Sequence, residues 1–371
     1  MHTYEDINDA FINSLKTLST DGIEYSPKKI KTKEILLYRI CIKNPIRRIL
    51  TIPHRYSNIF ATIAEMLWVF SGRDDLNFLS YFLPNAKNYS DNGKVWRGAY
   101  GPRLMDYNNT KFDQISNIIK TLKKDPFSRQ AIILIPLANQ DYDVNLNTKD
   151  RPCTIFVQFF IRNNELCCSA NLRSNDVIFG FSSINIPEWT FIQEIIAGIL
   201  KVKIGKYYHT ANSFHIYENH FARMHKILMS NKYNVYQFEK VEKQPIKFSS
   251  LNAFYISTKY FMACIEKSIN DKNFIYNEED VYNYLELDAM PYLDYLNLVL
   301  VFVTIKQSNY HKAYSLIDDI SRIDMKVAAL EYFIRFVKKQ CPSCAIEFIN
   351  KIEKENSFSQ PTIDFITGNW S

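Results

Sequence analysis

Two apolar segments, TIFVQFFIR at 154–162 and ELCCSANLRS at 165–174, are separated only by Asn163 and Asn164. Their β-branched and aromatic residues favour strands, and a two-residue asparagine connection is typical of a tight hairpin turn. A third strand is predicted just before them, at 129–137. The chain is therefore expected to contain a mainly antiparallel or mixed sheet.

Helices are predicted before and after these strands in the sequence. Apolar residues recur at helical spacing at 57–72, at 110–126 and in PEWTFIQEIIAGIL at 187–200. Residues 30–50 show the alternating and continuous apolar stretches of further strands. Strands and helices in this order predict an α+β fold.

The pattern changes near Asp280. From there almost every segment has the helical period, including 292–308 and 325–340. A chain of 371 residues also exceeds the usual size of a single core. We therefore predict two domains, an α+β domain at 1–239 and an all-helical C-terminal extension at 240–371.

The charge of the chain favours anionic ligands. Its net charge is +6, and Lys and Arg are spread along the sequence rather than gathered in a tail, so nucleic acid is not expected as a partner. The acidic N-terminal residues do not resemble a secretion signal. The longest apolar run, at 296–305, is too short to span a bilayer. A cytoplasmic protein with no membrane partner is expected.

The cysteines are predicted to be reduced thiols. There are seven, an odd number, without a secretion signal. The sequence CPSC at 341–344 has no second Cys or His pair at ligand spacing, so we interpret it as a helix start. No metal is expected.

Cys153 stands directly after Pro152, at the head of the strand at 154–162. Cysteine is usually a small buried apolar residue, so packing is the default interpretation. Two polar residues further along, Arg173 and Ser174, favour a second interpretation in which Cys153 is a nucleophile. The guanidinium fork matches two phosphate oxygens and the hydroxyl adds a third donor.

A second polar pair lies in ANSFHIYENHF at 211–221. His215 and Tyr217 are two residues apart, so in a strand they lie on one face. Both side chains can then form hydrogen bonds to a sugar hydroxyl. The two pairs together are typical of a nucleotide site.

The motifs EMLW, GAYGPR, DPFSRQ, RPCT, LRSND, GFSSIN and FHIYENH come one after another over roughly residues 25–230. In this order they resemble the thymidylate synthase and pyrimidine hydroxymethylase family, and most of all its phage-type members, which also tend to carry extra C-terminal helices. The resemblance implies the family's mixed sheet packed by helices. It also implies a pyrimidine nucleoside monophosphate as substrate, with 5,10-methylenetetrahydrofolate as one-carbon donor and no metal.

The resemblance assigns catalytic roles to three residues. Cys153 matches the nucleophile that adds to C6 of the pyrimidine, and Arg173 is expected to lower its pKa. Glu65 matches a general acid or base that works through water, and a lone carboxylate in an apolar helix is costly unless it is paired or has a function. Tyr100 matches a tyrosine that assists removal of the C5 proton.

The resemblance also assigns the residues that bind the ligands. Asn185 matches the asparagine that reads the base, because an amide complements both O4 and N3–H of uracil. The other matches are the phosphate ligands Arg173 and Ser174, the ribose pair His215 and Tyr217, the folate contact Asp176, and Arg129, which dimers of the family receive from the partner subunit.

The sequence departs from the best-known synthases at four points. Thr154 stands where they have a histidine, and Gln130 replaces a second arginine. The segment 85–93 lacks the tryptophan that packs by the folate, and one extra residue separates Gly180 from Asn185. Because exclusion of water favours hydride transfer, the missing tryptophan favours capture of water.

The sequence supports three hypotheses about function. The leading hypothesis is C5 methylation of dUMP to dTMP by a homodimeric enzyme. The alternative in the same chemistry is a C5 hydroxymethylase that acts on dUMP, dCMP or CMP. The third is a catalytically inactive family member that binds nucleotide or RNA, against which Cys153, Glu65 and Tyr100 all count.

Overall fold

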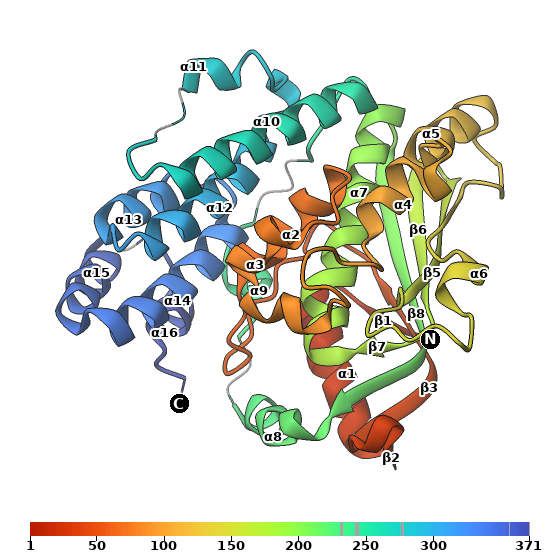
Figure 1. The fold of residues 1–371 in the computed structure, drawn as a ribbon. Coiled ribbons are helices and arrows are strands. Elements are labelled where there is room, and N and C mark those ends of the chain that lie inside the picture. The colour runs from red at the N-terminus through yellow and green to blue at the C-terminus, as the bar shows by residue number, and fades with distance from the viewer. Residues whose placement is uncertain (231–232, 242–244, 275, 277, 356, 371) are drawn as a thin grey trace.

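The computed structural model describes the chain except for residues 231–232, 242–244, 275, 277, 356 and 371. An eight-stranded mixed sheet, in the order β1-β3-β8-β6-β5-β4, runs through it, with β2 paired to β3 and β7 to β8 (Figure 1). The strands are β1 (His2–Tyr4), β2 (Ile23–Tyr25), β3 (Thr32–Ile42), β4 (Ile132–Leu134), β5 (Thr154–Arg162), β6 (Glu165–Leu172), β7 (Asn175–Asp176) and β8 (Lys203–Tyr217). The predicted α+β class is confirmed.

The predicted hairpin is present. Strands β5 and β6 pair antiparallel, and Asn163 and Asn164 turn between them with φ of 53° and 60°. Strand β8 then pairs parallel to β6 and antiparallel to β3, so it lies at the centre of the sheet. Because β5 begins at Thr154, the hairpin places Cys153 at the edge of a rigid element.

Nine α-helices belong to the described part of the chain that carries the sheet. They are α1 (Ile7–Asp21), α2 (Ile59–Phe70), α3 (Leu76–Phe82), α4 (Tyr100–Met105), α5 (Gln114–Lys124), α6 (Ala138–Asp141), α7 (Ile186–Leu200), α8 (Phe221–Met229) and α9 (Val235–Phe238). Helix α7 packs on β6 and β8, and α1 packs on β3. Residues along β5 and β6 alternate between buried and half-buried, as expected for a sheet with one covered face.

The described part of the chain after residue 239 is helical, as predicted. Its helices are α10 (Leu251–Asn270), α11 (Glu278–Val281), α12 (Leu293–Lys306), α13 (Tyr310–Asp318), α14 (Ile323–Gln340), α15 (Pro342–Glu355) and α16 (Gln360–Thr367). Helices α10, α12 and α14 all pack against α2 (Figure 1). We keep residue 239 as the proposed boundary of the two domains.

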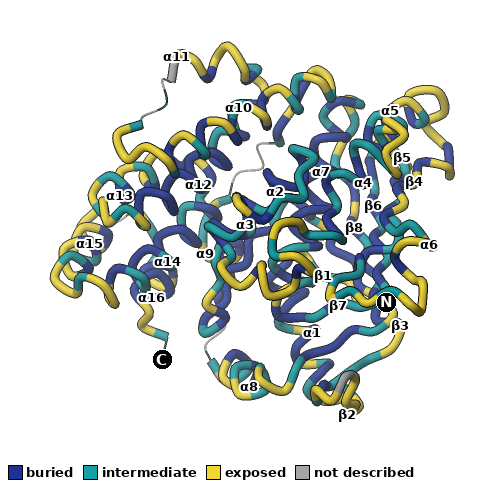
Figure 2. Tube along the Cα trace, in the orientation of Figure 1, coloured by how far each residue is buried: buried dark blue, intermediate teal, exposed yellow. Residues whose placement is uncertain are grey.

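The extension shares its core with the α+β domain. Phe60 of α2 lies 5.8 Å from Phe302 of α12 and 5.1 Å from Tyr332 of α14, measured between ring centroids. Buried residues occur on all three of these helices (Figure 2). Helix α2, apolar on all sides, is therefore covered both by the sheet domain and by the extension.

A buried ion pair also joins the two parts. Arg48 pairs with Glu194 of α7, and its Nη1 donates to the hydroxyl of Tyr295 on α12 at 3.2 Å. Both charged side chains are at most 1% exposed. Such a pair is costly to break, because either partner alone would be an uncompensated buried charge.

Two observations concern the extension itself. Cys341 and Cys344 form a disulfide, so the prediction of reduced thiols is wrong for this pair. One turn of helix brings residues three apart together, and α15 does begin at Pro342 as the predicted helix start requires. The segment Leu287–Lys306 is long and apolar enough to cross a membrane, but most of it is buried inside the protein.

Candidate active site

A cavity of about 280 Å³ lies where α2, α4, the start of β5 and the end of β8 meet. Eight of the predicted site residues line it, namely Glu65, Tyr100, Cys153, Ser174, Asp176, Asn185, His215 and Tyr217. A larger hollow of about 1190 Å³ between α7 and the extension contains none of them. Residues far apart in sequence thus converge on one cavity.

Arg173 lies against Cys153. Its Nη2 is 3.7 Å from the Cys153 Sγ, its Nε donates to the Pro152 carbonyl at 2.9 Å, and its backbone N–H donates to the Cys153 carbonyl at 2.9 Å. Burial raises the pKa of the Cys153 thiol, and the nearby Arg173 only partly opposes this. Arg173 therefore lowers the pKa of Cys153 as expected, but burial raises it by more. In the ligand-free protein Cys153 is a neutral thiol.

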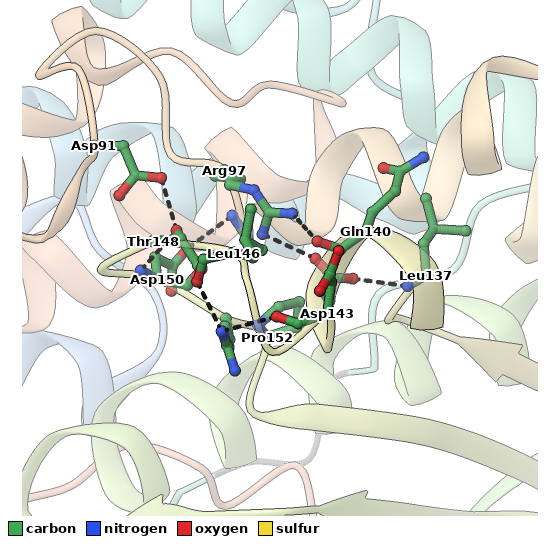
Figure 3. A network of polar contacts seen from close by, with 12 residues as sticks. Asp91, Arg97, Leu137, Gln140, Asp143, Leu146, Thr148, Asp150 and Pro152 are labelled. Carbon is green, nitrogen blue, oxygen red and sulfur yellow. Dashed lines mark hydrogen bonds and ion pairs between the residues drawn. The ribbon is translucent and has the colours of Figure 1, made fainter.

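The loop that leads to Cys153 is irregular but tied down by charged groups (Figure 3). Arg97 Nη1 pairs with Asp141 Oδ1 at 3.0 Å. The Thr148 hydroxyl donates to Asp91 at 2.7 Å. These contacts hold a segment without regular structure, so that Cys153 enters the cavity from a fixed direction.

Tyr100 is the first residue of α4 and reaches the head of β5. Its hydroxyl accepts a hydrogen bond from the Thr154 N–H at 3.1 Å, and its ring stacks on Trp189 with centroids 5.7 Å apart. Burial raises the pKa of the Tyr100 phenol, and the charges of Cys153 and Glu188 add to this. The phenol is therefore neutral and can relay a proton through a hydrogen bond.

Glu65 lies on α2 among buried apolar side chains. Burial raises the pKa of its carboxyl group to about 7. A carboxyl group with this pKa is present in both protonation states at neutral pH, which suits general acid and base catalysis.

Asn185 is held by a chain of buried hydrogen bonds. Its Oδ1 accepts from Asn175 Nδ2 at 2.8 Å, Asn175 Oδ1 contacts His209 Nε2 at 2.9 Å, and His209 Nδ1 contacts the Tyr207 hydroxyl at 2.9 Å. Burial lowers the pKa of His209 to about 3, so the ring is neutral and has one proton. Since Asn175 Oδ1 can only accept, that proton lies on Nε2 and Tyr207 donates to Nδ1. The amide nitrogen of Asn185 is left for the cavity.

The segment that leads to Asn185 is a π-helix, Val177–Asn185. A π-helical turn is one residue wider than an α-helical turn, so an insertion need not displace helix α7, which begins at the next residue. Asp176 caps the π-helix, since its carboxylate accepts from the Phe179 N–H at 2.7 Å. A Cβ on Gly180 would lie 2.7 Å from Asn175 Nδ2, so glycine is required beside the hydrogen-bond chain.

Of the residues predicted to bind the sugar and the phosphate, His215 and Tyr217 line the cavity and Arg129 does not. The rings of His215 and Tyr217 lie edge to face at the end of β8, 4.9 Å apart. Arg129 is exposed and does not line the cavity, and its carbonyl accepts from Gln158 on the uncovered face of β5. Its role as a ligand donated to a partner subunit stays a prediction.

The sequence reasoning missed Glu188, which also lines the cavity. The sequence feature that identified Glu65, a lone carboxylate in an apolar helix, could also have identified Glu188. It also missed Trp96, which lines the cavity although the segment 85–93 has no tryptophan. Among the described residues no cluster of three or more His, Cys, Asp or Glu suited to a metal ion is found.

Comparison with known proteins gives several matches. A deoxyuridylate hydroxymethyltransferase of Bacillus phage SP01 is 35% identical over 217 residues, which are 56% of this chain and 56% of that protein. That of Delftia phage PhiW-14 is 36% identical over 200 residues, 52% of this chain and 55% of the relative. A thymidylate synthase of Mycoplasma mobile is 30% identical over 166 residues, 45% and 49% of the two chains. The chain thus spans about half the length of these relatives.

The family described as thymidylate synthase matches residues 10–260, a stretch that contains the whole sheet from β2 onward and every residue of the cavity. This match confirms the resemblance inferred from the motifs. The chain belongs to the thymidylate synthase family.

Proposed function

We propose that this chain transfers a one-carbon unit to C5 of dUMP, with 5,10-methylenetetrahydrofolate as donor and Cys153 as nucleophile at C6. The observation that carries the proposal is the convergence of Cys153, Glu65, Tyr100 and Asn185 on one cavity. The phage relatives, named deoxyuridylate hydroxymethyltransferases, support dUMP as the substrate.

The hydrogen-bond chain behind Asn185 supports uracil as the base. With Asn185 Oδ1 bound to Asn175, the free Nδ2 donates to O4 of uracil, and the second lone pair of Oδ1 accepts from N3–H. Cytosine would present its amino group to the same Nδ2, donor against donor. A site with a fixed donor rejects the wrong partner strongly.

The first chemical steps use the groups of this chain. Cys153 adds to C6, and the pyrimidine then becomes nucleophilic at C5 and attacks the one-carbon unit that the folate supplies. Glu65, with its pKa of about 7, and the neutral phenol of Tyr100 then move the C5 proton through water. Elimination of Cys153 restores the aromatic ring at the end.

Aromatic residues of the cavity support a folate site. Trp96 and Phe179 line it, and Phe179 is 49% exposed, so flat aromatic surface is available for a pterin ring. Asp176 lies beside them. These residues would hold the donor next to the nucleotide.

The product that we propose is 5-hydroxymethyl-dUMP. The exocyclic methylene formed at C5 accepts either water or a hydride, and the phage relatives carry the name of the first reaction. The methyl product dTMP is the second candidate, because Trp96 lines the cavity where it can restrict water.

The same proposal includes a homodimer that pairs the uncovered faces of two sheets. Half-buried aromatic side chains, Phe156 and Phe160 of β5, lie on this face. The exposed Arg129 is held at its rim by Gln158. In a dimer of this kind Arg129 would reach the phosphate site of the partner subunit.

The test is to incubate the protein with methylenetetrahydrofolate and, in separate reactions, dUMP, dCMP, UMP and CMP, and to identify both products by mass spectrometry. Hydroxymethyl-dUMP with tetrahydrofolate is the expected pair, and dTMP with dihydrofolate would identify the second candidate. Cys153→Ser should lower turnover at least about a thousandfold. Absence of product from every nucleotide would contradict the proposal.

A further inference from the structure

Glu188 is a second buried carboxyl group in the cavity, and no protein group explains it. It lies on α7 and is 1% exposed. Its Oε2 has no hydrogen-bond partner in the described part of the chain. Burying a carboxyl group without a partner costs several kcal/mol, so the position calls for a reason.

Glu194, further along the same helix, shows how a structural carboxylate is held in this protein. It is equally buried, but Arg48 pairs with it and the Ile246 N–H donates to its Oε1 at 2.8 Å. Glu188 lines the cavity instead, together with Glu65. The contrast separates a carboxylate that stabilises the fold from one that faces a ligand.

The groups around Glu188 keep it protonated. Burial raises its pKa well above the usual range, and the charge of Glu65 raises it further. The other titratable groups that interact with it are the phenols of Tyr100 and Tyr207. Glu188 can therefore donate from one oxygen and accept at the other, next to a Glu65 that is partly ionised at neutral pH.

Two further buried polar atoms in this region have no partner among the described residues, Thr154 Oγ1 and Trp189 Nε1. Tyr100 connects them, since it accepts from the Thr154 N–H and stacks on the Trp189 ring. A water molecule needs two to four polar partners to occupy a buried position. Glu188 and Glu65 both line the cavity and can serve as such partners there, whereas Thr154 and Trp189 do not line it.

We propose that Glu188 is a catalytic residue that holds, together with Glu65, the water molecule that attacks the exocyclic methylene at C5. This inference rests on the proposed function. The water oxygen forms a bond to the methylene carbon, and its proton passes to the ionised Glu65. The electron pair of the exocyclic double bond returns to the ring and expels the Cys153 thiolate from C6. The net reaction consumes one water and releases 5-hydroxymethyl-dUMP.

The test compares Glu188→Gln with the wild-type protein in two reactions. One is exchange of the C5 hydrogen of dUMP in D2O, monitored by NMR, which needs the Cys153 adduct but no attack by water on a methylene. The other is formation of hydroxymethyl-dUMP. We expect the ratio of product formation to exchange to fall at least about 100-fold in the variant. A methyl product in the variant would also support the proposal.

Glu194→Gln is the matched control, because it changes an equally buried carboxylate of α7 outside the cavity and reports the effect of lost stability alone. Its ratio should equal that of the wild type. If Glu188→Gln does not fold, Glu188→Ser serves for the same comparison. An unchanged ratio in the folded Glu188 variant overturns the role of Glu188, whereas a wild-type protein that makes no hydroxymethyl product overturns the proposed function.

Discussion

Glu65 has one cause for its altered acidity, which is burial in an apolar helix. The folded pKa of about 7 lies above the ordinary value of 4.5, so the ionised form grows as the pH rises through 7. If the ionised form removes the C5 proton, kcat/KM should rise about tenfold per pH unit below pH 7 and level off above it. A profile from pH 5.5 to 9 measures this, and a flat profile over that range would contradict it.

His209 acts on the base only through Asn175 and Asn185, which makes it a positioning residue. We expect His209→Phe to keep the volume of the ring but free the Asn175 amide to rotate, since the buried hydrogen bond to Nε2 is lost. KM for dUMP should rise about tenfold or more, which corresponds to one buried hydrogen bond. Competition by dCMP should strengthen at the same time, and a variant with raised KM but unchanged discrimination would show a merely structural role.

At the scale of single residues, the sequence identified a site residue where a charged side chain stands in an apolar helix, because burying that charge costs free energy. Glu65 was found in this way, and Glu188 could have been found by the same reasoning. The chain from Asn185 to Tyr207 could not, because its members are polar residues on separate elements that only the folded sheet brings together.

Among the elements, those with strong local signals were predicted and those without were not. The hairpin β5–β6 and helices α2, α5 and α7 have continuous apolar periods. Strand β8 was not predicted over its length, because its glycine, lysines and asparagine dilute the strand signal although it is the centre of the sheet. Neighbouring strands, rather than its own residues, determine its conformation.

The π-helix leads to a prediction about Gly180. A methyl group there would lie 2.7 Å from Asn175 Nδ2 and 3.4 Å from Asn185 Oδ1, so one of the amides must move. We expect Gly180→Ala to lower kcat/KM for dUMP about 100-fold, since small misplacements of a positioning group have effects of this size. Steady-state kinetics measure it. Gly93→Ala is the control, because its φ of 70° strains an alanine while no atom lies within 4 Å of a Cβ there.

For the molecule as a whole, the ion pair between Arg48 and Glu194 should link the stability of the two halves. Arg48→Met leaves Glu194 buried without its partner, and we expect a loss of about 3–5 kcal/mol in the free energy of unfolding. Urea denaturation measures it. Adding Glu194→Gln should restore much of the loss, and additive effects of the two changes would argue against a direct interaction.

The sequence predicted a helical extension but not how it is joined to the rest. Apolar periodicity shows that α12 and α14 have buried faces without showing what covers them. Residues distant in sequence cover these faces, such as Phe60, whose ring contacts an aromatic ring of each helix.

Helix α2 has a further consequence, for tolerance of mutations. The helix that carries Glu65 has no free side, and α10, α12 and α14 form part of its surroundings. A change of volume in those helices shifts a helix that cannot relax toward solvent. Amino-acid changes in the last third of the chain, far from any nucleotide, should therefore lower turnover before they lower the amount of folded protein. Selection for turnover should act against such changes first.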